Sequence, residues 1–327
     1  MKAEVVSGWP KDNSIRISLS ETDASQVNAI RRALISDVPK LAINRVNFSQ
    51  GVVETNGEIL ESVNVLPDEV LAHRLAMIPI PTFPEEDLQP FETCSICIDL
   101  VESEKGCPTC QVLYSLNVQG PAADSEEEHI TVYAGDLTTI SDPMFDVKEE
   151  HRKIPLTILS KGQYLELYAF ATLGRGSSHQ KWSPAAGIGF SVRRVAKLNN
   201  AKKADVLFAL NLKTSDGRDI DAKLFGKDKK IDDINTVLDL ERALHQVGPG
   251  TGRDADFANA ITMEDMEGSY ILSYETDGSM SPETAFNLAM DELSDIPENI
   301  YRLWRFSARY IAPIGVILVF LNAIGLI

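Results

Sequence analysis

The chain has 327 residues, of which 44% are hydrophobic and 24% are charged. This length and composition are typical of a globular protein with a sizeable core, as two domains or as one domain with a large insertion. Lys and Arg number 31 against 48 Asp and Glu, so the formal net charge is −17. A surface this acidic repels phosphate backbones, which argues against broad direct contact with DNA or RNA.

The first residues, MKAEVVSGWPKDNS, contain no basic start followed by a long apolar run. A secretory signal requires both features. We therefore expect a cytoplasmic protein in a reducing compartment, where thiols stay free or bind metal.

The first predicted elements are a strand and a helix. Residues 14–20 (SIRISLS) alternate apolar and polar side chains, as a half-buried strand does. A helix over 24–37 is predicted next, because Asp23 is a good N-cap and Gln26 lies three positions later. Pro39 should end that helix, because proline disfavours helical geometry at its own position and at the one before it.

A second helix is predicted over 67–76, with Asp68 and Glu69 in its first turn, where negative charge is favourable. A later helix should open at Ser281, an N-cap followed by proline, and Pro297 should end or kink it. Strand-like runs occupy 111–117, 129–134, 164–172, 187–195 and 270–274.

All four cysteines fall within one short window and give the strongest chemical signal in the chain. They are Cys94, Cys97, Cys107 and Cys110, in the pattern C-x2-C, nine residues, C-x2-C. Two such pairs bring four thiolates to one point and leave no open position, which predicts one structural Zn²⁺ site. Two disulfides or a redox pair are the alternatives, and iron also binds closed thiolate sites.

Other short motifs fail to define an active site. Residues 174–179 lack the spacing of a nucleophile elbow, 248–252 lack the Lys-Ser/Thr of a phosphate loop, and 216–221 lack the full calcium-loop pattern. No group of residues supplies a nucleophile, a base and an oxyanion donor together. The sequence therefore offers no positive case for independent catalysis.

The C-terminal segment 311–327 carries no charge and follows three arginines. Its 17 residues sit at the lower limit of a membrane span, and a basic flank suits an anchor on the cytoplasmic side. A helix buried against a partner, or a tail peculiar to this chain, are the other interpretations. Pro313, Gly315 and Gly325 weaken a helix there, so membrane contact is not favoured.

Three segments, taken in order, resemble the family of archaeal D-type RNA polymerase subunits. They are 28–43 with 68–79 (NAIRR…VP…AI and DEVLAHRLAMIP), 173–185 (LGRGSSHQKWSPA), and 274–278 (YETDG) followed by Pro282. That family is related to the third-largest subunit of eukaryotic RNA polymerase II and to the bacterial alpha subunit. Related subunits often carry a zinc-binding loop where the four cysteines lie.

The resemblance implies an α+β fold, in which an alpha-subunit-like dimerisation domain is interrupted by a mainly β insert domain. The dimerisation domain would comprise 1–46 and 187–310, the second part containing a family-atypical insertion at 196–262. The insert domain would be 47–186, with the zinc loop at 94–110, and 311–327 would remain as an apolar tail. Some archaeal relatives carry an iron–sulfur domain near 196–262, but no cysteine lies there, so no such cluster is expected.

The resemblance also implies a role as a non-catalytic assembly subunit. The chain would pair with a small alpha-like partner of the subunit L type, and the heterodimer would nucleate assembly of the large catalytic subunits. Small subunits N and P would lie nearby, and catalytic magnesium would belong to another chain. The rival hypothesis is a membrane-tethered zinc adaptor unrelated to transcription, which rests on the tail and the cysteines.

Two predicted helices carry apolar stripes suited to a partner or to the chain's own core. Arg31 and Arg32 form a basic edge that would bridge to acidic groups on a large subunit or face solvent. The candidate interface residues are Val27, Ile30, Arg31, Arg32, Leu34, Phe286, Met290 and Leu293.

Overall fold

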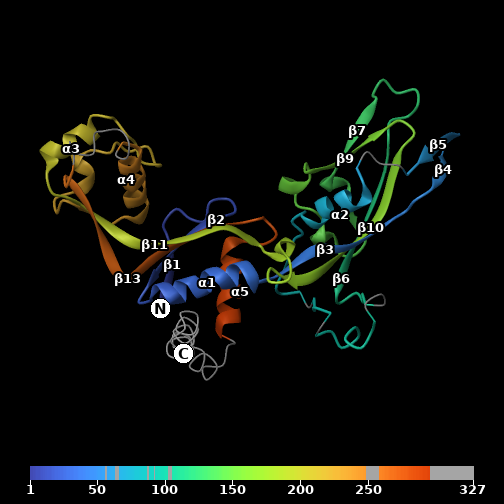
Figure 1. The fold of residues 1–327 in the computed structure, drawn as a ribbon, viewed down its shortest axis with the longest axis horizontal. Helices are drawn as coiled ribbons and strands as arrows, with labels where there is room; N and C mark the ends of the chain where they lie inside the picture. The colour runs from blue at the N-terminus through green and yellow to red at the C-terminus, as the bar shows by residue number, and fades with distance from the viewer. Residues whose placement is uncertain are drawn as a thin grey trace, which may run out of the picture. The chain divides into compact units, whose positions relative to one another are not determined.

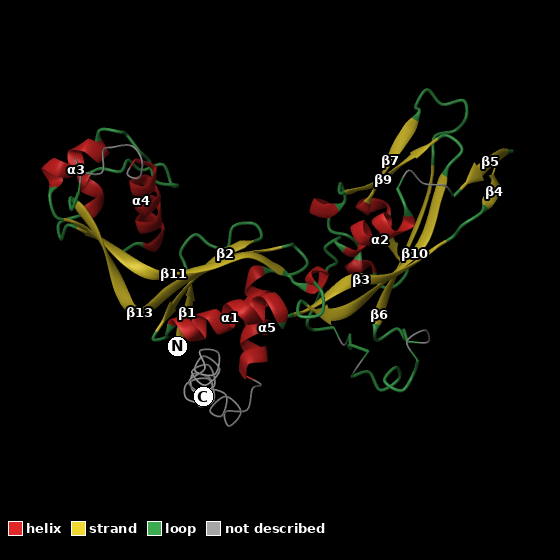
Figure 2. Cartoon of the chain, in the orientation of Figure 1, coloured by secondary structure: helices red, strands yellow, loops and turns green. Residues whose placement is uncertain are grey.

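The computed structural model describes residues 1–55, 57–62, 66–86, 88–91, 93–101, 105–247 and 258–294. Helices and antiparallel sheets form an α+β fold (Figure 1 and Figure 2). The chain divides into two compact units. Among the described residues, the first contains those of Met1–Arg31 and Ala185–Asp277, and the second contains those of Arg32–Pro184 and 278–294.

The first unit is built on a five-stranded sheet that joins both ends of the chain. Its strand order is β1-β2-β13-β11-β12. Residues 14–20 form the predicted strand β2, whose apolar side chains are buried at alternate positions. β2 runs antiparallel to β13, with Ser14 opposite Glu275 and Ser20 opposite Ser269. The strands are β1 (Lys2–Val5), β2 (Ser14–Ser20), β11 (Ala185–Leu198), β12 (Lys230–Ile231) and β13 (Ile261–Thr276).

β11 and β13 are both longer than the strands predicted at 187–195 and 270–274. β13 pairs with β2 only from Ser269 onward, whereas its earlier part pairs with β11 alone. This two-stranded extension carries charged pairs: Arg194 lies 2.8 Å from Asp265, and Lys197 lies 3.3 Å from Glu264. Charged cross-strand pairs lack the apolar alternation that indicates a strand in sequence, which is why the prediction stopped short.

The extension carries a small lobe with its own core (Figure 1). The lobe consists of α3 (Ala201–Phe208), a 3-10 helix (Ala222–Phe225), β12 and α4 (Ile234–Val247). Apolar side chains pack together in the interior of this lobe. Their buried members are Ala196, Leu198, Ala204, Leu207, Ile220, Phe225, Ile231, Val237, Leu240, Ala243 and Ala260.

A polar contact ties this lobe to the N-terminal hairpin of the same unit. The Asn235 side chain, in the first turn of α4, donates to the Ser7 carbonyl at 2.9 Å. Its Oδ1 accepts from Trp9 Nε1 at 3.2 Å and from Arg16 at 3.1 Å. The Arg16 guanidinium also lies over the Trp9 ring, 4.6 Å from the centroid, in a cation–π contact. Asn235 thus joins residues far apart in sequence.

The second unit contains a four-stranded sheet of order β3-β10-β6-β8, against which α2 packs. The predicted helix and strands of this region are present with ends shifted by a few residues. Two further antiparallel pairs are β4 with β5 and β7 with β9. The bounds are β3 (Pro39–Phe48), β4 (Val52–Thr55), β5 (Glu58–Glu61), α2 (Asp68–Ala76), β6 (Gln111–Gln119), β7 (His129–Tyr133), β8 (Thr138–Thr139), β9 (Pro155–Ser160) and β10 (Tyr164–Arg175).

The predicted helix caps are confirmed at both remaining helices. Oδ1 of Asp23 accepts from the backbone N–H groups of Ser25 at 2.9 Å and Gln26 at 3.0 Å, at the start of α1 (Ala24–Ser36). Oγ of Ser281 accepts from the Thr284 N–H at 3.1 Å, at the start of α5 (Pro282–Ser294). Pro297 lies outside the described residues.

The apolar segment 311–327 also lies outside the described residues. Within the part of the chain that the structure describes, no helix has both the length and the apolarity that crossing a membrane requires.

Truncating a side chain in the apolar core of the small lobe should reduce the local stability of that lobe. Leu240 is fully buried in α4, so Leu240→Ala should lower the free energy of local unfolding by about 2–5 kcal/mol. Amide hydrogen exchange of α3 and α4 measures this loss. Leu210→Ala, at an exposed position of the same lobe, should change it by less than about 0.5 kcal/mol. Equal protection in the two variants would contradict a cooperative apolar core.

Candidate metal centre and partner surface

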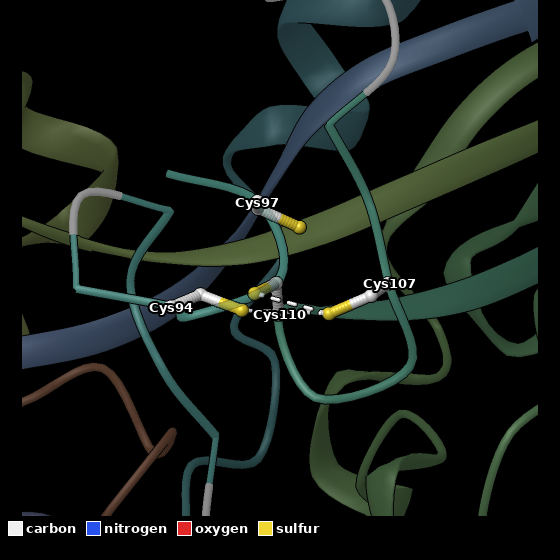
Figure 3. Close-up of side chains that lie close together, drawn as sticks. All are labelled: Cys94, Cys97, Cys107 and Cys110. Atoms are coloured by element: carbon white, nitrogen blue, oxygen red, sulfur yellow. Dashed lines mark hydrogen bonds between the residues drawn. The ribbon is translucent and has the colours of Figure 1, made fainter. Parts of the chain in front are cut away.

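The four cysteines sit in two turns that precede strand β6. The Cys97 N–H donates to the Cys94 carbonyl at 3.2 Å, and the Cys110 N–H donates to the Cys107 carbonyl at 3.0 Å. Each turn folds one C-x2-C pair back on itself, which places its two thiols on the same side. β6 begins at Gln111, so the second pair is attached directly to the four-stranded sheet. Figure 3 shows the four side chains converging.

The sulfur atoms are close enough for one ion to contact all of them. They lie within 4.8 Å of one another, with Cys107 Sγ 3.6 Å from Cys94 Sγ and 3.4 Å from Cys110 Sγ. A tetrahedral thiolate site with metal–sulfur bonds of about 2.3 Å has sulfur–sulfur edges of about 3.8 Å. A disulfide would require about 2.05 Å, and all four cysteines are free thiols. The geometry therefore fits a single closed metal site.

The loop around the sulfurs cannot be held by a hydrophobic core. Cys94, Cys97 and Cys110 are buried, and the only larger apolar side chain packed on them within the described residues is Phe91. Ile96 and Ile98, by contrast, are exposed. The segment thus turns sulfur inward and apolar groups outward. A metal ion bound by the thiolates would supply the cross-links that such a loop otherwise lacks.

Hydrogen bonds and burial act on the thiols in opposite directions. Hydrogen bonds, of which the one with Cys110 has the largest effect, lower the pKa of the Cys94 thiol to about 6. The Thr109 hydroxyl, 2.9 Å from Cys107 Sγ, lowers the pKa of that thiol as well. Burial raises the pKa of Cys110. The cysteine spacing alone did not identify Thr109 as part of the site. Its position between the two cysteines of the second pair is the sequence signal that could have done so.

The predicted interface residues divide into covered and accessible sets. Val27, Ile30 and Leu34 on α1 are buried within this chain, whereas Arg32 is exposed. Arg31 is half-buried, and its Nε donates to Asn28 Oδ1 at 3.0 Å within the helix. The apolar residues of α5 keep part of their surface accessible. These half-buried residues are Phe286, Met290 and Leu293.

An ion pair fixes α5 within the second unit. Arg175, the last residue of β10, lies 2.8 Å from Glu292. The Arg175 guanidinium also donates to the Asp37 carbonyl. Pairing of residues this distant in sequence leaves no local pattern, so sequence reasoning did not identify it.

The Gly-x-Gly…Lys-Trp motif is explained by close packing. A Cβ at Gly174 would lie 2.4 Å from the Trp182 ring, and a Cβ at Gly176 would lie 1.9 Å from the Ile35 carbonyl oxygen. Trp182 Nε1 donates to the Thr172 carbonyl at 3.0 Å. Both positions therefore require glycine, and the tryptophan is half-buried against β10 rather than freely projecting.

Comparison with known proteins defines the class. The family model of the RNA polymerase Rpb3/Rpb11 dimerisation domain matches residues 16–296, and the chain belongs to that family. Proteins named DNA-directed RNA polymerase subunit Rpo3 are its relatives. The protein of Picrophilus torridus is 30% identical over 300 residues, which cover 89% of this chain and 95% of the relative.

Two further relatives carry the same name. The protein of Methanothermobacter thermautotrophicus is 31% identical over 276 residues, covering 84% of this chain and 88% of the relative. That of Thermoplasma volcanium is 28% identical over 287 residues, covering 87% and 93%. The resemblance to the archaeal D-type polymerase subunits is thereby confirmed.

Loss of one thiol should abolish stable metal binding. Cys107→Ser replaces a soft thiolate by a hydroxyl and leaves three ligands, so the purified variant should lose its metal. Elemental analysis of the purified protein measures this. Thr93→Ala changes an exposed residue of the same loop whose hydroxyl donates to the Pro90 carbonyl, and it should retain the wild-type metal content. An unchanged metal content in Cys107→Ser would contradict the site.

Metal affinity should rise with pH, because the metal binds thiolates and protons compete for them. The raised pKa of Cys110 keeps this thiol protonated in the metal-free protein, so binding must release its proton. Cys94 is already ionised above a pH of about 6, so its protonation reduces the metal affinity only below that pH. The affinity, titrated from about pH 8 to about pH 5, should fall roughly tenfold per pH unit for each such proton, most steeply at the acid end. A pH-independent affinity would contradict thiolate ligation.

Proposed function

We propose that this protein is a non-catalytic assembly subunit of a DNA-directed RNA polymerase. The observation that carries this proposal is the match of the Rpb3/Rpb11 dimerisation domain over residues 16–296. Support also comes from relatives of nearly the same length that are named polymerase subunit Rpo3. Nucleotidyl transfer would be performed by other chains of the complex.

The dimerisation domain of the proposal is made from both ends of the chain, 1–46 and 187–310, with 47–186 as the insert domain. The pairing of β2 with β13 supports this arrangement, because it brings an N-terminal strand beside a C-terminal one. A small alpha-like chain of the subunit L type would pair with this domain. The heterodimer would nucleate assembly of the large catalytic subunits, with small subunits of the N and P types nearby.

We assign the partner contact to the accessible apolar side chains of α5. Phe286, Met290 and Leu293 are half-buried and offer the apolar area that an obligate interface requires. Val27, Ile30 and Leu34 are buried and would hold α1 in place. Arg31 and Arg32 of that helix would pair with acidic groups on a large subunit.

The metal of the proposal is one structural Zn²⁺ held by Cys94, Cys97, Cys107 and Cys110. Four soft thiolates in a closed site suit zinc and leave no position for water or substrate. The ion would fix the loop, with its outward apolar residues, into one shape on which neighbouring subunits dock. The net charge of −17 leaves DNA and RNA contact to those neighbours.

Affinity purification of the tagged chain from a native lysate tests the assignment. The chain should be recovered at one copy per complex with a small alpha-like protein and two large subunits. Recovery of the chain alone would overturn the proposed function.

The α5 surface has its own test. Phe286→Asp places a charge in the proposed apolar interface and should reduce recovery of the small partner by about tenfold or more. Asn287→Asp places the same charge at an exposed neighbouring position and should leave recovery within about twofold of wild type. Equal recovery with both variants would remove α5 from the interface.

A further inference from the structure

An apolar groove lies between helix α2 and the β7–β9 pair in the second unit, remote in sequence from the cysteine loop. α2 packs beside β9 (Figure 1). Two adjoining cavities, each of about 400 Å³, share Arg74 and Pro155 in their walls. Val70, Met77 and Ile154 line the first cavity, and Tyr133, Thr157 and Ile158 line the second.

The rim of this groove exposes large apolar side chains. Val70 is 41% exposed, Met77 58%, Tyr133 41% and Ile158 42%. Single exposed apolar residues are ordinary, but several around one concave surface mark an interaction site. None of these four residues contributes to the metal site or to α5, so the proposed zinc and dimerisation surfaces do not account for them.

Arg74 places a cation in the wall of this groove. Arg74 donates through Nη1 to the Leu156 carbonyl at 2.9 Å. Among the described residues, no carboxylate lies within ion-pair distance of its guanidinium, although the chain has an excess of acidic groups. A guanidinium flanked by apolar walls favours a planar carboxylate, which accepts two parallel hydrogen bonds from it.

Thr157 is a second polar residue that lines the groove. Thr157 is only 3% exposed, and its Oγ1 makes no hydrogen bond within the described part of the chain. Thr157 and Arg74 line the same cavity. A buried hydroxyl without a partner is unfavourable, so the wall of this cavity carries a polar cost that packing alone does not offset.

We propose that this groove is a docking site for an apolar segment of another polypeptide, and that one Asp or Glu of that segment pairs with Arg74. The exposed apolar rim extends the contact along α2 and the β7–β9 pair, which a protein segment can follow over its length. Charge complementarity identifies the segment as acidic at one position. The inference rests on the proposed function, because the polypeptide belongs to the polymerase assembly.

The proposed docking segment differs from the apolar tail of this chain in its acidic side chain. Residues 311–327 contain no acidic side chain, so they offer no Asp or Glu to pair with Arg74. A segment that satisfies the proposal must carry a carboxylate among apolar residues.

The test is site-specific photo-crosslinking in the assembled complex. Benzoylphenylalanine replaces Met77 in the full chain, the tagged complex is purified, and the irradiated product is sequenced by mass spectrometry. A crosslink is expected to an apolar segment of another subunit that contains an Asp or Glu. The same group placed at Ile140, which is exposed but lines neither cavity, should not reach that segment.

Charge reversal then tests the ion pair. Arg74→Glu should lower the yield of the Met77 crosslink by at least about threefold, and Lys or Arg in place of the crosslinked carboxylate should restore it. Lys202→Glu makes the same change of charge at an exposed position of the small lobe and should leave the yield of the Met77 crosslink unchanged.

The outcomes separate the two proposals. If the polymerase complex is intact but shows no Met77 crosslink, the groove assignment alone is overturned. The same holds if the crosslink reaches residues 311–327, a second copy of this chain or a segment without an acidic residue. So does an Arg74→Glu complex with an undiminished yield. Recovery of the chain without polymerase subunits overturns the proposed function and the groove assignment together.

Discussion

The antiparallel pairing of β2 with β13 is the constraint on which the rest of the first unit depends. It places Ser14–Ser20 against a strand near the other end of the described chain, so nearly everything between them must leave this sheet and return to it. Closing so long a loop costs conformational entropy, but the cost grows only with the logarithm of loop length. A continuous ladder with buried Ile15, Ile17 and Leu19 offsets it, and large structured segments are therefore accommodated within one fold.

Three segments between these strands are stabilised by different interactions. The four-stranded sheet and α2 bury a conventional apolar core that includes Leu71, Leu75 and Tyr114. The lobe on the β11–β13 extension has a smaller apolar core and a polar tie through Asn235. The cysteine loop has almost no apolar interior, so a metal ion bound by the convergent thiolates would take the place of side-chain packing.

Apolar side chains remain accessible in two places on the second unit. On α5, apolar side chains remain half-buried while the ion pair between Arg175 and Glu292 fixes the helix. Between α2 and the β7–β9 pair, apolar rims surround the guanidinium of Arg74, which has no carboxylate partner among the described residues. An acidic exterior elsewhere disfavours nucleic acid. Under the proposed assembly function, both surfaces would act through packing and charge.

The sequence by itself determined what depends on neighbouring residues: the caps at Asp23 and Ser281, the strand alternation at 14–20, and the paired cysteine spacing that brings four sulfurs together. These follow from interactions a few residues apart, which local patterns encode. Only the tertiary structure decided the full length of β13, the burial of Val27, Ile30 and Leu34, and the groove around Arg74. Those features arise where distant segments meet, and pairing or burial between distant residues leaves no periodic signal along the chain.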